Sequence, residues 1–194
     1  MKILILDNYD SFTYNLVHLL HHVLIHDGKE SDLHVIRNDK IALDDVNAFD
    51  KILLSPGPGI PLEAGIMPEL VRRYAPSKSI LGVCLGHQCI GEVFGAKLVN
   101  MQAPVHGKAT LTTICEPDEK LFTGLPSPIR TGRYHSWLVD REGFPAELAI
   151  TAIDDQGRIM ALRHRRYNVC GVQFHPESVL TEHGDIMMRN WLNL

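Results

Sequence analysis

The chain has 194 residues, 45% of them hydrophobic and 22% charged, which is typical of a soluble enzyme and suits a single α/β domain over residues 1–194. The formal net charge of −4 argues against an electrostatic nucleic-acid partner, and no apolar run is long enough to span a membrane. The four cysteines show no spacing typical of zinc sites or disulfide frameworks, so we expect a cytoplasmic protein with reduced thiols and no metal or cofactor.

Strand and helix patterns alternate over the first half of the chain. Apolar runs predict strands over residues 2–6, 33–37, 51–55 and 79–83, and helical patterns cover residues 11–26, 68–74 and 85–94. The second half is rich in strand patterns, over residues 109–114, 129–134, 148–152, 159–163 and 169–174, before a helix over 184–192. We therefore predict an α/β fold: an open, mostly parallel sheet with helices on both faces and a small antiparallel extension.

The first predicted helix carries four histidines at helical spacing, His18, His21, His22 and His26. The opposite, buried face of the helix carries Phe12, Leu16, Leu19, Leu20 and Val23, and no carboxylate or cysteine joins the histidines within the helix. We interpret the histidines as an exposed polar face and not as a metal site.

A rigid loop follows the strand that is predicted over residues 51–55. Residues 55–59 read Ser-Pro-Gly-Pro-Gly, with the two glycines beside prolines. Backbone N–H groups in such a loop can point at one spot, which suits an oxyanion hole. The loop lacks the Lys-Ser/Thr pair of a phosphate-binding P-loop, and a simple tight turn is the alternative interpretation.

Cys84 lies between the strand predicted over 79–83 and the helix predicted over 85–94. Residues 82–88 read Gly-Val-Cys-Leu-Gly-His-Gln, the pattern of a nucleophile elbow with cysteine in place of serine. A thiol at a helix N-terminus meets the positive end of the helix dipole, which favours the nucleophilic thiolate. An inert buried cysteine between two packing glycines is the alternative.

His175 follows another buried strand pattern, and Glu177 lies two residues beyond it. Because the carboxyl ends of parallel strands gather at one edge of a sheet, His175 can face Cys84 there. Glu177 can accept the imidazole proton and fix its tautomer. The sequence therefore predicts a Cys84/His175/Glu177 triad.

These motifs resemble the three signatures of class I (triad) glutamine amidotransferases, and the resemblance covers the whole chain. The opening Asp-Asn-Tyr-Asp-Ser-Phe-Thr-Tyr-Asn of residues 7–15, His-Gly-Lys at 106–108 and Arg-Tyr-His-Ser at 133–136 resemble the chorismate-using branch, which serves anthranilate or para-aminobenzoate synthesis. The fold that this implies is the flavodoxin-like fold of class I amidotransferases. Trp137 departs from the leucine of many relatives, a change that a backbone role would tolerate.

The resemblance implies that L-glutamine is the substrate and that Cys84 attacks its side-chain amide. His175, oriented by Glu177, would hold the proton and pass it to ammonia, and the N–H groups of Gly57 and Leu85 would form the oxyanion hole. The residues implied in glutamine binding are Gly57, Pro58, Gly59, Gln88, Ser136 and Trp137.

A chorismate-using synthase subunit, component I, is the partner that the resemblance implies. It would use the ammonia to make anthranilate for tryptophan, or the para-aminobenzoate precursor for folate, and we favour anthranilate. A cysteine peptidase or γ-glutamyl hydrolase remains an alternative, as does a non-catalytic subunit, although no member of the triad is missing.

Overall fold

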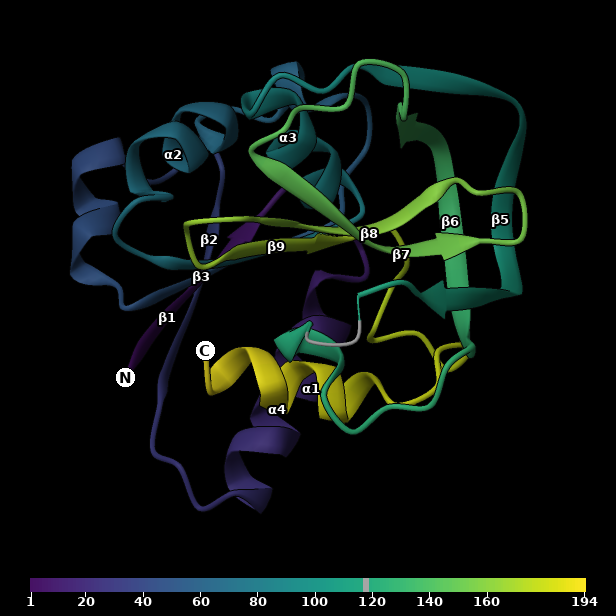
Figure 1. The fold of residues 1–194 in the computed structure, drawn as a ribbon. Helices are drawn as coiled ribbons and strands as arrows, with labels where there is room; N and C mark the ends of the chain where they lie inside the picture. Colours follow the sequence, from purple (N-terminus) through teal and green to yellow (C-terminus); the bar gives the residue numbers. More distant parts are fainter. Residues whose placement is uncertain (117–118) are drawn as a thin grey trace.

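The computed structural model describes residues 1–116 and 119–194 of the chain. Within these residues the first half supplies the parallel strands β1 (Lys2–Asp7), β2 (Asp32–Arg37), β3 (Lys51–Leu54) and β4 (Ser79–Val83). The second half supplies β5 (Leu98–Ile114), β6 (Ile129–Val139), β7 (Leu148–Asp154), β8 (Ile159–His164) and β9 (Val169–Val172). All nine form one sheet, in the order β2-β1-β3-β4-β9-β8-β7-β5-β6 (Figure 1).

The pairing changes direction at β9. The strands from β2 to β9 pair in parallel, and β9 is inserted beside β4 although it lies almost ninety residues further along the chain. From β9 to β6 every pair is antiparallel. The predicted α/β class, with a parallel sheet and an antiparallel extension, is confirmed.

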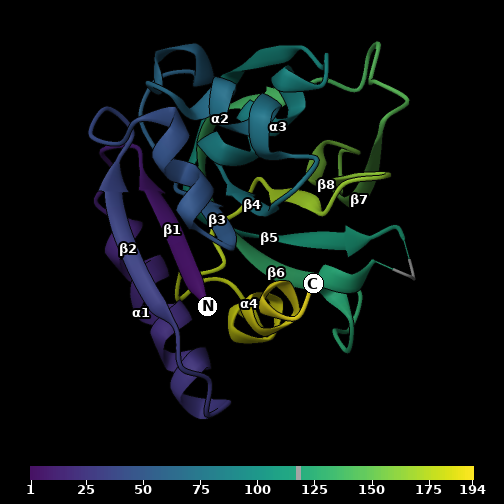
Figure 2. The same ribbon diagram turned by 90° about the vertical axis from the view of Figure 1, so that its left-hand side faces the viewer.

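Helices cover both faces of the parallel part of the sheet (Figure 2). One face packs against α1 (Thr13–His26) and α4 (Gly184–Leu192), and the other against α2 (Met67–Tyr74) and α3 (Leu85–Val93). Side chains alternate across a strand, so Ile3 and Ile5 of β1 join the first core while Leu4 and Leu6 join the second. Short 3-10 turns occur at Leu43–Ala48, Pro61–Glu63 and Lys120–Phe122.

Strand β5 is the largest difference from the sequence-based prediction, because it begins at Leu98 and not near residue 109. Most of its side chains are exposed, and its register against β6 shifts between Asn100 and Val105 and again between His106 and Lys108. Such bulges break the regular alternation of apolar and polar residues that identifies a strand in a sequence. Strand β6 correspondingly runs on to Val139 and borders the region of the predicted site.

The surface is consistent with the predicted polar face of α1. His18, His21, His22 and His26 are all exposed there.

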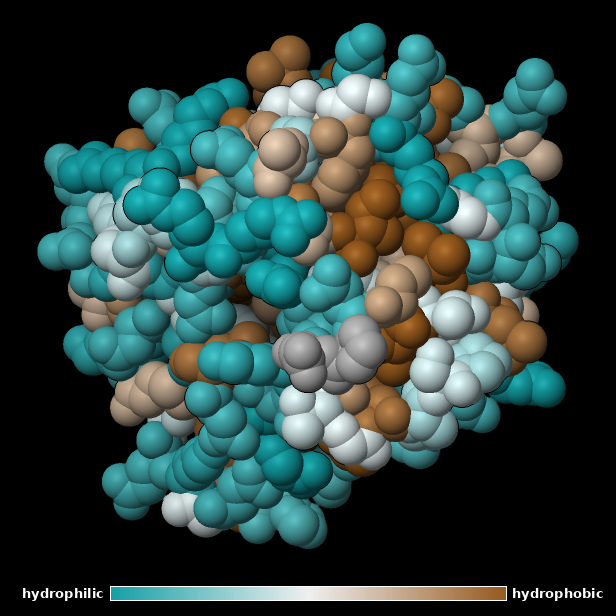
Figure 3. Space-filling model, viewed as in Figure 1, coloured by the Kyte–Doolittle hydropathy of each residue, from teal (hydrophilic) through white to brown (hydrophobic). Residues whose placement is uncertain are grey.

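Polar side chains cover much of the view in Figure 3, while apolar ones gather over β7 and β8. No helix among residues 1–116 and 119–194 is long and apolar enough to cross a membrane.

Candidate active site

Cys84 lies at a sharp turn between β4 and α3, as the sequence predicts. Its backbone has φ 52° and ψ −98°, and residues other than glycine rarely adopt such a positive φ. Its N–H donates to the carbonyl of Val172 in β9 at 2.9 Å, and its own carbonyl accepts from the N–H of Gln88 at 3.0 Å. The neighbouring strand and the first turn of the helix therefore hold the strained residue in place.

The two flanking glycines are required by close backbone packing. A Cβ on Gly82 would lie 2.5 Å from the carbonyl oxygen of Gly86, and a Cβ on Gly86 would lie 2.7 Å from that of Leu54. Real Cβ atoms do not approach backbone atoms so closely. The first turn of α3 thus packs directly onto β3 and β4, and this contact sets the position of Cys84.

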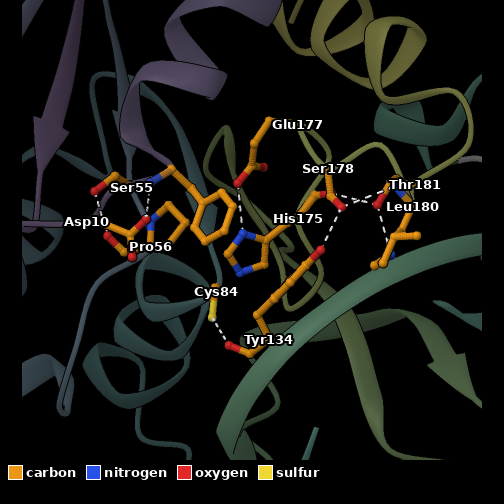
Figure 4. Close-up of polar contacts among 12 residues, drawn as sticks. Asp10, Ser55, Pro56, Cys84, Tyr134, His175, Glu177, Ser178, Leu180 and Thr181 are labelled. Atoms are coloured by element: carbon orange, nitrogen blue, oxygen red, sulfur yellow. Dashed lines mark hydrogen bonds and ion pairs between the residues drawn. The ribbon is translucent and has the colours of Figure 1, made fainter. Parts of the chain in front are cut away.

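His175 and Glu177 form a buried pair just beyond β9. His175 Nδ1 lies 2.7 Å from Glu177 Oε1, and the two side chains are 3% and 0% exposed. The backbone N–H of His175 donates to the carbonyl of Gly132, and Thr181 Oγ1 donates to the carbonyl of His175 at 2.6 Å. Figure 4 shows the ring between Glu177 and Cys84, with its second nitrogen on the Cys84 side. The structure therefore brings the three predicted triad residues together.

The surroundings of His175 favour its protonated form. Burial by itself would lower the pKa of this imidazole, but hydrogen bonding and charge from Cys84 and Glu177 outweigh it and raise the pKa to about 10. The Glu177 carboxylate on one side and the Cys84 sulfur on the other stabilise the imidazolium. His175 can therefore hold the proton that a departing amine needs.

The loop of residues 55–59 lies against the elbow because Asn8 holds it there. The Asn8 N–H donates to Ser55 Oγ at 2.9 Å, and Asn8 Nδ2 donates to the carbonyl of Ser55 at 2.9 Å. A Cβ on Gly57 would lie 2.7 Å from both the Cβ of Asn8 and the Cδ2 of Leu85. Only a glycine fits at residue 57, and its backbone is next to Leu85, the other residue predicted to form the oxyanion hole.

A cavity of about 250 Å³ opens beside Cys84. It is lined by every residue predicted to bind glutamine, namely Gly57, Pro58, Gly59, Gln88, Ser136 and Trp137. The rest of the lining comes from residues 104–106 of β5 and 134–135 of β6. A larger cavity of about 430 Å³ lies near the start of β9, at the other end of that strand from His175, and contains no member of the triad.

Three polar or aromatic residues at the site were missed by the sequence analysis. Tyr134 packs edge-on against His175, with ring centroids 5.0 Å apart, and its hydroxyl lies 3.1 Å from Ser178 Oγ. Phe12 contacts the same imidazole from another side, at 5.9 Å between centroids. Gln173, which is fully buried, directs its amide nitrogen at Cys84 Sγ from 3.6 Å. The signal for Gln173 was a polar residue inside an apolar strand pattern.

Residues 4–194 match the sequence profile of the glutamine amidotransferase class-I family, and the chain belongs to this family. The match covers the elbow, the loop of residues 55–59 and the His175–Glu177 pair. It confirms the family that the sequence motifs indicated.

Several proteins are similar in sequence to this chain over nearly its full length. The chain is 47% identical to anthranilate synthase component 2 of Thermus thermophilus, over 99% of this chain and 92% of the relative. It is 42% identical to aminodeoxychorismate synthase component 2 of Escherichia coli, over 98% and 99% of the two chains. The crystal structure of a Thermoplasma acidophilum protein, described as a putative GMP synthase subunit, superimposes with a TM-score of 0.86 at 25% identity, covering 100% of this chain and 92% of that one.

Proposed function

We propose that this protein is the glutaminase subunit of a synthase that aminates chorismate to anthranilate. The observation that carries the proposal is the buried 2.7 Å His175–Glu177 pair facing a strained Cys84 at the wall of the cavity. The name of the Thermus thermophilus relative supports the choice of synthase.

Cys84 is the proposed nucleophile, and glutamine the proposed substrate. Its sulfur attacks the side-chain amide carbon of glutamine, and His175 protonates the departing nitrogen, so that ammonia leaves and a γ-glutamyl thioester forms. Glu177 keeps the proton of the imidazole on Nδ1 and stabilises its charge. Water activated by His175 then attacks the thioester and releases glutamate.

The proposed oxyanion hole consists of the backbone N–H groups of Gly57 and Leu85. The close packing of Gly57 against Leu85 supports this role, because donors must be fixed before charge develops on the substrate oxygen. Each such donor contributes up to about 3 kcal/mol to transition-state stabilisation. The N–H of Leu85 also begins α3, where the helix dipole favours negative charge.

The proposed partner surface surrounds the mouth of the cavity. It consists of residues 56–61, 106–108 and 134–137, and we call it the rim. Pro58 and Gly59 on one side of the rim and His106 on the other are exposed and also line the cavity. A chorismate-using subunit that binds the rim would cover the cavity and receive ammonia before it becomes protonated in water.

Reconstitution with each type of chorismate-using subunit tests the proposal. With glutamine and chorismate, the complex with an anthranilate synthase component I should produce anthranilate, identified by mass spectrometry. The glutaminase rate should also rise above that of the isolated chain, because the partner completes the site. Failure to hydrolyse glutamine with either partner would refute the glutaminase function.

The para-aminobenzoate pathway is the second candidate, favoured by the 42% identity to the aminodeoxychorismate component of Escherichia coli. Formation of aminodeoxychorismate alone in the same reconstitution would select it. For either pathway we propose the cytoplasm as the site of action, and the four free cysteines fit such a reducing compartment.

A further inference from the structure

A buried ion pair lies behind the substrate-binding segment, away from the triad. Arg133 of β6 and Asp154 of β7 are joined by a 2.8 Å contact between Nη1 and Oδ2, and their side chains are 2% and 0% exposed. The other oxygen of Asp154 accepts the backbone N–H groups of Gln156 and Arg158 at 3.0 and 2.8 Å. Such a pair is costly to bury, so its position calls for an explanation.

The ion pair fixes the tautomer of His135. Arg133 Nε can only donate, and it lies 3.1 Å from His135 Nε2, which must therefore be the unprotonated nitrogen. The proton of the neutral ring is then on Nδ1, which donates to the carbonyl of Trp137 at 3.0 Å. Burial, together with the charge of Arg133, lowers the pKa of His135 to about 3, so the ring stays neutral at physiological pH.

The carbonyl of Trp137 connects this ring to the active site. It accepts a second hydrogen bond, from Gln88 Nε2 at 2.9 Å, and the same nitrogen donates to Gln173 Oε1 at 3.2 Å. Both hydrogens of the Gln88 amide are then used, so the oxygen of that amide is the atom left for a ligand. Gln173 in turn directs its own nitrogen at the sulfur of Cys84.

We propose that Asp154, Arg133 and His135 are positioning residues for glutamine hydrolysis. Through the Trp137 carbonyl they hold the Gln88 amide so that it presents an acceptor to the cavity, where the ammonium group of an amino-acid substrate supplies donors. The same chain of hydrogen bonds keeps the N–H of Gln173 on Cys84. This inference rests on the proposed glutaminase function. The three residues act through the Trp137 carbonyl, although His135 also contributes to the wall of the cavity.

Two substitutions of His135 separate positioning from simple core packing. Asparagine places its amide nitrogen near the position of Nδ1, so His135→Asn keeps a donor for the Trp137 carbonyl but loses the partner of Arg133. Glutamine reaches the position of Nε2, so His135→Gln keeps the partner of Arg133 and loses the donor. If His135 positions the Trp137 carbonyl, His135→Gln should have the higher KM for glutamine of the two variants.

Steady-state kinetics of the reconstituted complex give the test. For His135→Gln we expect the KM for glutamine to rise about tenfold, because a tenfold change corresponds to the net free energy of about one hydrogen bond. The kcat should change by less than about threefold. For His135→Asn we expect a smaller rise in KM, of about threefold, because the donor to the Trp137 carbonyl remains but Arg133 no longer orients it. An equal rise in both variants, no rise in either, or the reverse order would overturn the proposal.

Nitrogen-15 NMR of the wild-type chain tests the tautomer without enzyme turnover or a variant that must fold. The His135 ring should show a protonated Nδ1 and an unprotonated Nε2 from pH 8 to pH 5. A charged ring at pH 5, or a proton on Nε2, would overturn the chain of hydrogen bonds. If the wild-type complex does not hydrolyse glutamine, the proposed function fails, and this measurement still decides separately whether Arg133 and Trp137 fix the His135 ring as described.

Discussion

The strained backbone of Cys84 predicts that glycine stabilises the fold at this position. At φ 52° and ψ −98° the residue lies outside the regions that side chains favour, and such conformations cost on the order of 1–3 kcal/mol. Glycine has no Cβ and relieves this strain, at the expense of about 0.5–1 kcal/mol from the greater freedom of the unfolded chain. Cys84→Gly should therefore be more stable than Cys84→Ala by about 1 kcal/mol.

A matched control is the same change at an unstrained position. Ala75 has helical angles, φ −51° and ψ −40°, and is 2% exposed. Ala75→Gly should lower the free energy of unfolding by about 1 kcal/mol, the usual cost of glycine in a helical conformation. The effect of replacing alanine with glycine should thus have opposite signs at residues 84 and 75.

Urea unfolding at constant pH, followed by circular dichroism, measures both differences. In thermal unfolding 1 kcal/mol corresponds to about 2–4 °C in Tm for a chain of this size. A Cys84→Gly variant that is less stable than Cys84→Ala by the same amount as in the control would refute the argument that the elbow is strained.

Three further predictions concern the cysteines, the triad and the buried histidines. A reactive glutamine analogue should alkylate Cys84 alone, because burial raises the pKa of the other three thiols, and comparable labelling elsewhere in peptide mapping would contradict the assignment. His175→Ala should lower kcat by about 10⁴-fold, and Glu177→Gln by less because the imidazole remains; a fully active Glu177→Gln would remove Glu177 from the triad. The free energy of unfolding should fall as the pH drops below about 6.5, because burial lowers the pKa of His87 to about 4 and that of His135 to about 3, so only the unfolded chain takes up protons. Each of these two histidines contributes up to about 1.4 kcal/mol per pH unit to this slope, and His135→Asn should remove one such contribution in urea titrations.

The parts of the site that sequence reasoning found are encoded locally. The glycines around Cys84 indicate a turn where backbone packs on backbone, and the nucleophilic cysteine lies in the same short segment. His175 and Glu177 are two residues apart, so their pairing needs no knowledge of the fold. What joined them to Cys84 was the general rule that parallel strands end at one edge.

The parts that were missed depend on pairing between distant strands. Arg133 and Asp154 meet only because β6 and β7 flank β5 in the sheet, an order that strand patterns do not reveal. Asn8 likewise acts on a loop almost fifty residues away. The sequence does not predict the full length of β5, because the strand is exposed and bulged and its residues do not alternate between apolar and polar. Polar residues inside apolar strand patterns are the signal that the sequence offers for such contacts.

The central claim is that Cys84 releases ammonia from glutamine for use by a partner subunit. The most direct test measures product formation by the reconstituted complex carrying Cys84→Ala, with either glutamine or an ammonium salt as the nitrogen source. We predict that the variant complex aminates chorismate from ammonium at the wild-type rate and forms no product from glutamine. Continued product formation from glutamine, or loss of the ammonium-dependent reaction, would contradict this account.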